Sequence, residues 1–229
     1  MKFDLLIFDL DGTLIDSQLD LANSVNAARG HLGLPPIDNQ RVFSYVGDGA
    51  PMLIRRALGP EVNEDQVLEA LEFFLAWYRD HMLDHTRLYE GVREALDRLH
   101  WRRVKMAVLT NKPVGFSRRL VEGLGLDAHF ERVYGGNSFE HKKPHPIGVE
   151  TLLAELGVGR HRALMVGDSA VDVRTARQAG IEACGVRWGF QPETFETDPP
   201  DMLVGRMEEL AEVVLASPHR AGPALVAPE

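Results

Sequence analysis

Two aspartates one residue apart follow a short apolar run near the N-terminus, and this arrangement limits the possible folds more than any other feature. The run is Leu5 to Phe8, and Asp9 and Asp11 come directly before Gly12 and Thr13. Such a run predicts a strand buried on both faces. Carboxylates at its end are costly to desolvate unless something pairs with them. At the carboxyl edge of a parallel sheet they could meet a cation and a substrate, and an ordinary turn is the alternative.

Composition excludes several classes of protein. The chain has 229 residues, of which 45% are hydrophobic, so one large domain or a domain with an insertion is expected. The net charge of −9 and the lack of a basic block argue against nucleic acid or a membrane as partner. Acids interrupt the N-terminal apolar run, and no apolar stretch of about 18 residues follows, so neither a signal peptide nor a membrane span is predicted. Cys184 is the single cysteine, so no disulfide can form within the chain and a cytoplasmic location is expected. The expected oligomeric state is a monomer or a homodimer.

Residues 16–85 show helical periodicity and no strand pattern. Glycines and prolines divide this stretch near Gly33–Pro36, at Gly47–Gly49 and at Gly59–Pro60. Its last part predicts a long amphipathic helix, whose apolar face carries Val67, Leu71, Phe74, Leu75, Tyr78 and Met82. An all-helical unit of this size is expected to form a small domain or an insertion.

From Leu88 onward, strand patterns alternate with helix patterns. The predicted strands are Val104–Leu109, a short one near Val133, Ala163–Val166 and a last one at about Glu182–Val186. This alternation is typical of a parallel sheet with helices on both faces, and the N-terminal strand is expected to join it. We therefore expect an α/β core from residues 1–15 and 86–215, a helical insertion at 16–85, and a disordered tail at 216–229.

Polar side chains recur where the predicted strands end. Besides the two N-terminal acids, these are Thr110 and Asn111, then Asp168 with Asp172, and Lys143 in a loop between them. Each has a plain alternative as a turn residue, a helix N-cap or a solvated lysine. The carboxyl ends of parallel strands meet at one edge of a sheet, so these polar side chains are expected to lie together. Four independent plain explanations for residues at one edge account for the pattern poorly.

A set of this kind suits phosphoryl transfer. Oxygen ligands from Asp9, Asp11 and Asp168 fit Mg²⁺, which also takes phosphate oxygens. One carboxylate can attack phosphorus, and a second can protonate the leaving oxygen and then activate water. Thr110 and Lys143 can hold the phosphoryl oxygens.

Four ordered motifs resemble those of the haloacid dehalogenase superfamily of phosphatases. They are Asp9-Leu10-Asp11-Gly12-Thr13, Thr110-Asn111, Lys143-Pro144 and Gly167-Asp168-Ser169-x-x-Asp172. The resemblance covers residues 3–190. It implies a Rossmann-like, doubly wound parallel sheet with an inserted helical cap of the first type. It also implies a Mg²⁺-dependent phosphomonoester hydrolase that acts through an aspartyl-phosphate.

The resemblance also implies residue roles. Asp9 is expected to be the nucleophile and a metal ligand, and Asp168 a second ligand. Asp11 is expected to be the general acid and base, with its main-chain carbonyl on the metal. Phosphate is expected to bind Thr110, Asn111 and Lys143. Asp172, Ser169 and Thr13 are expected to support the residues that contact the metal and the phosphate.

Within the superfamily the chain is similar to the phosphoglycolate phosphatases. The stretch Gly47-Asp48-Gly49-Ala50-Pro51-Met52-Leu53 resembles that family's cap signature, except that the family has asparagine where Asp48 stands. The implied reaction converts 2-phosphoglycolate to glycolate and phosphate. Backbone N–H groups of Gly47 and Gly49, with the fork of Arg56, are the expected cap contacts to the substrate carboxylate; solvated helix arginines are the alternative.

Several alternative functions stay open at this point. Sugar phosphates, nucleoside monophosphates or pyrophosphate could be the substrate, and a sugar-phosphate mutase would keep both acids. From another class, a phospho-accepting receiver module also places acids, a threonine and a lysine at strand ends. That interpretation is disfavoured because its phospho-acceptor lies on a middle strand. For the enzyme, residues 13–16 and 84–87 are the expected hinges of a closing cap.

Overall fold

A six-stranded sheet with all strands parallel is the centre of this computed structural model, which describes residues 2–216. In spatial order the strands are β5 (Arg132–Tyr134), β4 (Lys105–Leu109), β1 (Leu5–Phe8), β6 (Ala163–Gly167), β7 (Glu182–Val186) and β8 (Met202–Val204). The chain runs outward from β1 on one side and then crosses to the other side. This reversal makes the carboxyl end of β1 the place where an open α/β sheet binds ligands.

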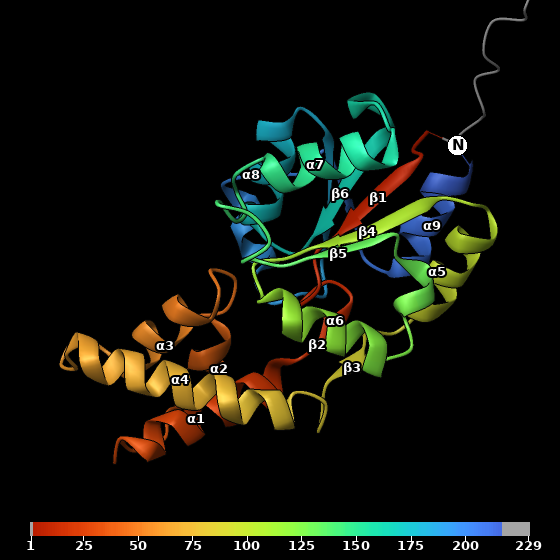
Figure 1. Cartoon of the computed structure of the whole chain (residues 1–229). Coiled ribbons are helices and arrows are strands. Elements are labelled where there is room, and N and C mark those ends of the chain that lie inside the picture. Colours follow the sequence, from red (N-terminus) through yellow and green to blue (C-terminus); the bar gives the residue numbers. More distant parts are fainter. Residues whose placement is uncertain (1, 217–229) are drawn as a thin grey trace, which may run out of the picture.

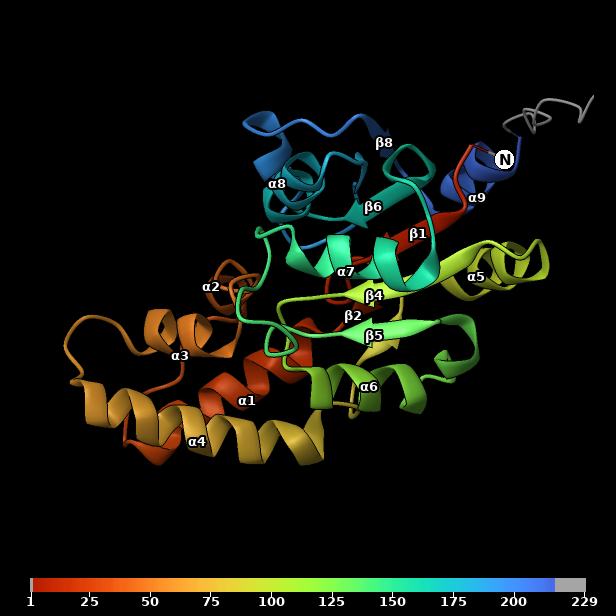
Figure 2. The same cartoon turned by 45° about the horizontal axis from the view of Figure 1, so that its top comes forward.

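Alternate residues of β1 face two separate apolar cores. Leu5 and Ile7 belong to one core and Leu6 and Phe8 to the other, and all four are fully buried. Helices cover both faces, as Figures 1 and 2 show. The first core includes α7 (Ile147–Leu156) and α8 (Ala170–Ala179). The second includes α5 (Val92–Trp101), α6 (Val114–Gly123) and α9 (Met207–Ala216). The expected Rossmann-like, doubly wound class is confirmed.

Four helices between residues 18 and 81 form a body beside the sheet (Figures 1 and 2). They are α1 (Gln18–His31), α2 (Asn39–Phe43), α3 (Ala50–Leu58) and α4 (Glu64–His81). The Asp38 side chain accepts a hydrogen bond from the Gln40 N–H at the start of α2, and Asn63 caps α4 in the same way. Within residues 2–216 no helix has the length and apolar character needed to cross a membrane.

A short antiparallel ribbon joins the helical body to the sheet. It pairs β2 (Ile15–Asp16) with β3 (Arg87–Leu88), at the two crossing points of the insertion. Asp20, at the start of α1, is buried and accepts hydrogen bonds from the backbone and side chains of both His85 and Thr86. Burial by itself raises the pKa of Asp20, but these hydrogen bonds outweigh it and hold the pKa below the usual 3.8.

The end of the chain differs from the sequence-based expectation. The strand at Glu182–Val186 is not the last, because β8 pairs with β7 and α9 packs against α5. A three-residue strand that follows prolines carries too little periodicity to be recognised. Ala216, assigned to the disordered tail, is the last residue of α9, and the rest of that prediction lies outside the described residues.

Replacing Asp20 with asparagine is expected to lower the free energy of unfolding at pH 7 by about 1–3 kcal/mol, because charge-assisted hydrogen bonds are lost. A depressed pKa stabilises the fold above the unfolded-state pKa, and this contribution disappears as pH falls through the lower folded pKa. Urea unfolding should therefore show the difference at pH 7 and a shrinking difference below pH 3.8. The exposed Asp80→Asn serves as the control. A pH-independent difference would contradict the role given to the Asp20 charge.

Candidate active site

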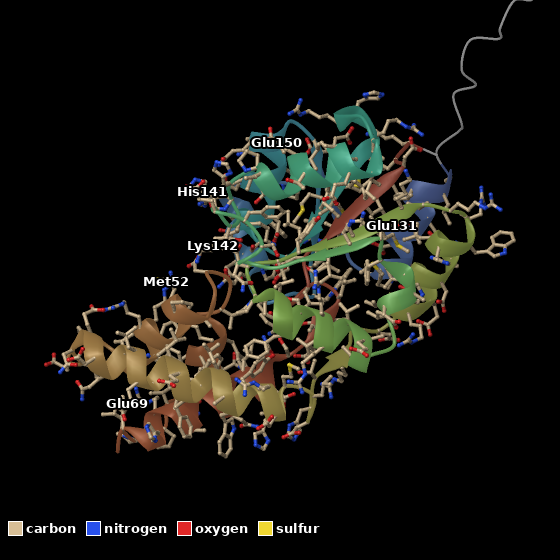
Figure 3. All side chains as sticks on the ribbon, viewed as in Figure 1. Met52, Glu69, Glu131, His141, Lys142 and Glu150 are labelled. Carbon is tan, nitrogen blue, oxygen red and sulfur yellow. The ribbon has the colours of Figure 1, made fainter. Side chains whose placement is uncertain are left out.

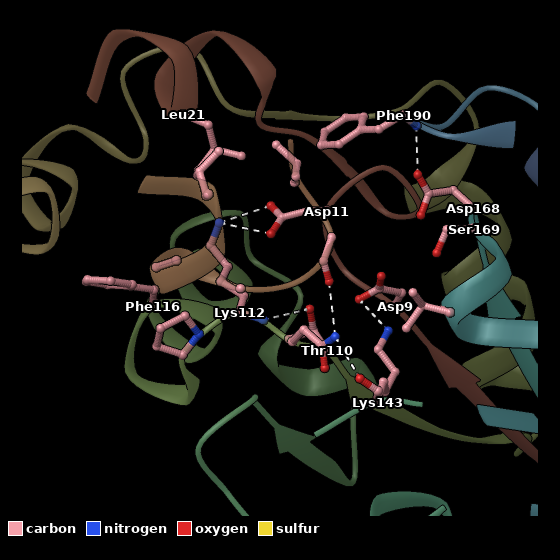
Figure 4. Close-up of a pocket in the computed structure, with 18 of the residues that line it drawn as sticks. Asp9, Asp11, Leu21, Thr110, Lys112, Phe116, Lys143, Asp168, Ser169 and Phe190 are labelled. Atoms are coloured by element: carbon pink, nitrogen blue, oxygen red, sulfur yellow. Dashed lines mark hydrogen bonds and ion pairs between the residues drawn. The ribbon is translucent and has the colours of Figure 1, made fainter. Parts of the chain in front are cut away.

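A pocket lies at the carboxyl edge of the sheet, between the sheet and the helical body, and Figure 4 shows its polar floor. Its lining brings together most of the residues that the sequence singled out, namely Asp9, Asp11, Gly47, Gly49, Thr110, Asn111, Lys143, Asp168 and Ser169. Apolar walls come from α1, α3, α4 and α6 through Leu21, Leu53, Phe74 and Phe116. The strand ends therefore supply the chemistry, and three helices of the helical body, together with α6 of the core, close the pocket.

Asp9 follows β1 directly and lies in a desolvated position. One carboxylate oxygen accepts the Leu10 N–H at 2.7 Å and lies 3.0 Å from the Lys143 Nζ. A hydrogen bond from the Thr110 side chain adds to these contacts. Burial nevertheless raises the pKa of Asp9 to about 6, against the attraction of Lys143. The positive charge of Lys143 is therefore too small to offset the burial of the Asp9 carboxylate.

Lys143 links Asp9 to Asp172. Its Nζ lies 2.6 Å from an Asp172 oxygen, and the lysine is almost fully buried. The other Asp172 oxygen accepts hydrogen bonds from the N–H and hydroxyl of Ser169, at 3.2 and 3.0 Å. Burial alone would lower the pKa of Lys143, but the two carboxylates raise it, so the ammonium stays charged.

Asp168 approaches the backbone that follows β1. It accepts the Phe190 N–H at 2.7 Å. Burial and the neighbouring Asp172 and Asp9 raise the pKa of Asp168 well above 3.8. A Cβ at Gly12 would lie 2.2 Å from an Asp168 oxygen, and Gly12 has a φ of +78°. Only glycine fits that combination of close approach and left-handed backbone.

The carboxylates fit a divalent cation. Oxygens of Asp9, Asp168 and Asp172 all lie within 4.8 Å of one another. Desolvation and mutual repulsion oppose ionisation of Asp9 and Asp168, and a hard cation would reverse both effects. Asp172 is already held by Lys143, so Asp9 and Asp168 are the side chains left to bind metal. Asp11 turns its carboxylate elsewhere, which leaves only its main-chain carbonyl for this purpose.

Asp11 has two partners that sequence reasoning did not assign. Lys112 Nζ lies 3.0 and 3.1 Å from the two Asp11 oxygens, and the Ser17 hydroxyl donates to one of them at 2.5 Å. Lys112 also donates to the hydroxyl of Tyr78, on α4, at 2.7 Å. Burial raises the pKa of Tyr78 to about 12, so this phenol is neutral. The sequence placed Tyr78 in the core of the helical unit, but this residue also lines the pocket.

Several contacts hold the helical body against the sheet at this pocket. The Asn111 amide donates to the carbonyls of Gly47 and Lys143, at 3.0 and 3.1 Å, and its own oxygen is buried without a partner among residues 2–216. The Gln191 amide donates to the Val46 carbonyl at 2.7 Å. Lys142, on the side of the core that faces α3 in Figure 3, donates to the carbonyl of Asp48. Three side chains from outside the helical body therefore donate hydrogen bonds to the loop around Gly47.

Three predicted site residues do not line the pocket, namely Asp172, which pairs with Lys143, and Arg56 and Thr13. The Arg56 guanidinium lies 2.5 Å from the Asp48 carboxylate and 3.3 Å from the Tyr45 carbonyl. Asp48 thus engages the arginine that was expected to bind substrate. The Thr13 hydroxyl is buried without a hydrogen-bond partner in the described part of the chain, and its carbonyl accepts from the Trp188 indole at 3.1 Å.

Comparisons with known proteins agree with this geometry. The sequence profile of haloacid dehalogenase-like hydrolases matches residues 6–186. A phosphoglycolate phosphatase from Chromobacterium violaceum is 41% identical over 90% of this chain and 94% of its own length. A phosphoglycolate phosphatase from Vibrio parahaemolyticus is 38% identical over 93% of this chain and 96% of its own length. A crystal structure of a predicted phosphoglycolate phosphatase from Haemophilus somnus superposes with a TM-score of 0.88 at 31% identity, over 93% of this chain and 98% of that one.

Gly12→Ala is expected to weaken Mg²⁺ binding about 10- to 100-fold, because the new methyl group displaces the Asp168 carboxylate. Isothermal titration calorimetry would measure the affinity. Gly33→Ala is the matched control, since Gly33 also has a positive φ of +71° but has no atom within 4 Å of the added Cβ. Wild-type affinity in Gly12→Ala would show that Asp168 does not need its present position to bind the metal.

Proposed function

The chain belongs to the haloacid dehalogenase-like hydrolases and is a phosphatase, and from this premise we propose that it is a Mg²⁺-dependent enzyme that hydrolyses 2-phosphoglycolate to glycolate and phosphate. The observation that carries the chemistry is the contact of Asp9 with Lys143 at the end of β1, 3.0 Å apart and next to Asp168. The substrate rests on relatives of that name at 34–41% identity, which match most of the chain.

In the first step of the proposed mechanism, an Asp9 oxygen attacks phosphorus and forms an aspartyl-phosphate. Lys143 and Thr110 lie beside the attacking group and hold the phosphoryl oxygens as their charge is redistributed. Asp9, Asp168 and the main-chain carbonyl of Asp11 would hold Mg²⁺, which when bound would neutralise negative charge on those oxygens. Asp172 keeps Lys143 in place through its 2.6 Å ion pair.

Asp11 moves the protons. In its acid form it protonates the ester oxygen, so that glycolate leaves as an alcohol. It then takes a proton from the water that attacks the aspartyl-phosphate, which releases phosphate and restores Asp9. Ser17 and Lys112 fix the direction of the Asp11 side chain.

We also propose that residues 16–85 act as a cap over a core formed by residues 1–15 and 86–215. Pocket residues from both parts, such as Gly49 and Tyr78 opposite Asp9, support this division. Closure about the β2–β3 ribbon would exclude water from the pocket. A cytoplasmic location, a monomeric or homodimeric state and the absence of nucleic-acid or membrane partners stay predictions from the sequence.

Other reactions of the same family are the alternatives to this proposal. They are hydrolysis of a sugar phosphate, a nucleoside monophosphate or pyrophosphate, and phosphoryl transfer by a sugar-phosphate mutase. Membership of the hydrolase family sets aside the receiver-type module.

Phosphate release from a substrate panel tests the proposed reaction. With Mg²⁺, 2-phosphoglycolate is expected to have the highest kcat/KM among itself, glucose 6-phosphate, AMP and pyrophosphate, because the short acid fits a pocket closed by helices. EDTA should abolish the activity, and added Mg²⁺ should restore it. Faster turnover of another member would retain the mechanism and reject the substrate. Full activity in EDTA would reject the metal requirement.

Asp9→Asn is expected to reduce kcat at least about 1,000-fold, since the amide cannot act as the nucleophile. The fold should survive, because the substitution removes a charge that burial already disfavours. Phosphate release and far-UV circular dichroism would check both points. Asp80→Asn, an exposed change on α4, should leave both unaltered. Retained turnover in Asp9→Asn would assign the nucleophile to another residue.

A further inference from the structure

We propose that Lys112 binds the carboxylate of the substrate and thereby selects phosphorylated hydroxy acids over other phosphomonoesters. The inference rests on the proposed function, because it names the residue that recognises the part of 2-phosphoglycolate that is not transferred. It replaces the cap arginine expected from the sequence with a lysine of the core, in the loop directly after β4.

Charge within the pocket leads to this assignment. Among the described residues that line it, Lys112 and Lys143 carry positive charge. Lys143 already faces two carboxylates, those of Asp9 and Asp172, and is placed for the phosphoryl group. Lys112 faces one carboxylate, Asp11, and the neutral hydroxyl of Tyr78. A substrate with a phosphate at one end and a carboxylate at the other brings one more anion than Lys143 and the metal can balance.

Distance supports the same assignment. In 2-phosphoglycolate the carboxylate is bonded to the carbon that carries the leaving oxygen. Asp11 is the acid for that oxygen, and the Lys112 Nζ lies 3.0 Å from Asp11. An ammonium group beside the acid is therefore beside the carboxylate as well. Figure 4 shows Lys112 and Lys143 reaching the two aspartates from different sides, so one lysine can serve each end of the substrate.

The surroundings of Lys112 make its charge effective. The side chain is only 6% exposed, and its Nζ lies 4.6 Å from the centre of the Tyr78 ring. Apolar Leu21 and Phe116 also line this part of the pocket. Away from water, an ion pair between the ammonium and a carboxylate is stronger than at the surface. A buried carboxylate without a cation would be strongly disfavoured.

A substrate carboxylate can find hydrogen-bond donors there by taking the place of one Asp11 contact. The three N–H donors of the Lys112 ammonium are directed at both Asp11 oxygens and at the Tyr78 oxygen. Because lysine can only donate, the Tyr78 oxygen accepts, and within residues 2–216 no acceptor takes the Tyr78 hydroxyl proton. Lys112 and Tyr78 together can therefore donate to both oxygens of a carboxylate. The cap would contribute to recognition through this phenol, while Arg56 stays on Asp48.

Lys112→Met tests the proposal when 2-phosphoglycolate is compared with 2-hydroxyethyl phosphate, which has a hydroxymethyl group in place of the carboxylate. The expected loss of kcat/KM for 2-phosphoglycolate is about 30-fold or more. Loss of the Asp11 contact affects both substrates equally, so the ratio of the two kcat/KM values isolates the carboxylate. That ratio should fall at least about tenfold. An unchanged ratio would reduce Lys112 to a positioning residue for Asp11 and overturn the proposal.

Further variants separate the role of Lys112 from the roles of its neighbours. Tyr78→Phe keeps the ring and should lower the same ratio several-fold, and it decides the matter if Lys112→Met does not fold. Lys105→Met, whose Nζ donates to the Leu156 carbonyl far from the pocket, is the control and should leave the ratio unchanged. A fall of the ratio in Arg56→Gln but not in Lys112→Met would assign the carboxylate to the cap arginine. If the wild type itself lacks a preference for 2-phosphoglycolate, the proposed substrate is wrong and the Lys112 assignment is rejected with it. If the wild type has that preference and Lys112→Met keeps it, only the Lys112 assignment is rejected.

Discussion

The contacts of Lys143 with Asp9 and Asp172 are the interaction on which the candidate site depends. Three acids gather in a desolvated place, and one buried ammonium offsets only part of their charge. The raised pKa values of Asp9 and Asp168 record that imbalance. A site of this kind gains most when a cation and an anionic substrate arrive together, because each then supplies the charge that the other needs. The same imbalance that opposes folding therefore favours binding.

The sheet makes this meeting possible. β1 lies between β4 and β6, so the ends of three strands place residues near positions 9, 110 and 168 side by side although they are far apart in sequence. The helical body adds what the sheet edge lacks, namely apolar walls and the Tyr78 hydroxyl. Asn111 connects the two parts, since its amide contacts both the Gly47 loop and the Lys143 loop. Asn111 is thus one of three side chains, with Gln191 and Lys142, that hold the helical body at the pocket.

Much of this could be predicted from the sequence, for physical reasons. The apolar strand β1 and the polar residues at strand ends carry strong local signals, and their order matched a family. Contacts that arise only in three dimensions were missed. Lys112 resembles a solvated loop lysine and Tyr78 a core aromatic, and nothing local shows that they meet. The pairing of Arg56 with Asp48 likewise depends on how the chain turns before α3. Short β8 gives almost no periodic signal, and its place is shown by its parallel pairing with β7.

Trapping the phosphoryl group on Asp9 tests the central claim most directly. Asp11→Asn should still accept phosphate from 4-nitrophenyl phosphate, whose leaving group needs no proton, but it should activate water poorly. Acid quenching, followed by mass spectrometry of the peptides, should then find the phosphoryl group on the peptide that contains Asp9, and Asp9→Asn should carry none. A phosphoryl group on any other residue, or continued turnover without a phosphorylated peptide, would contradict the account.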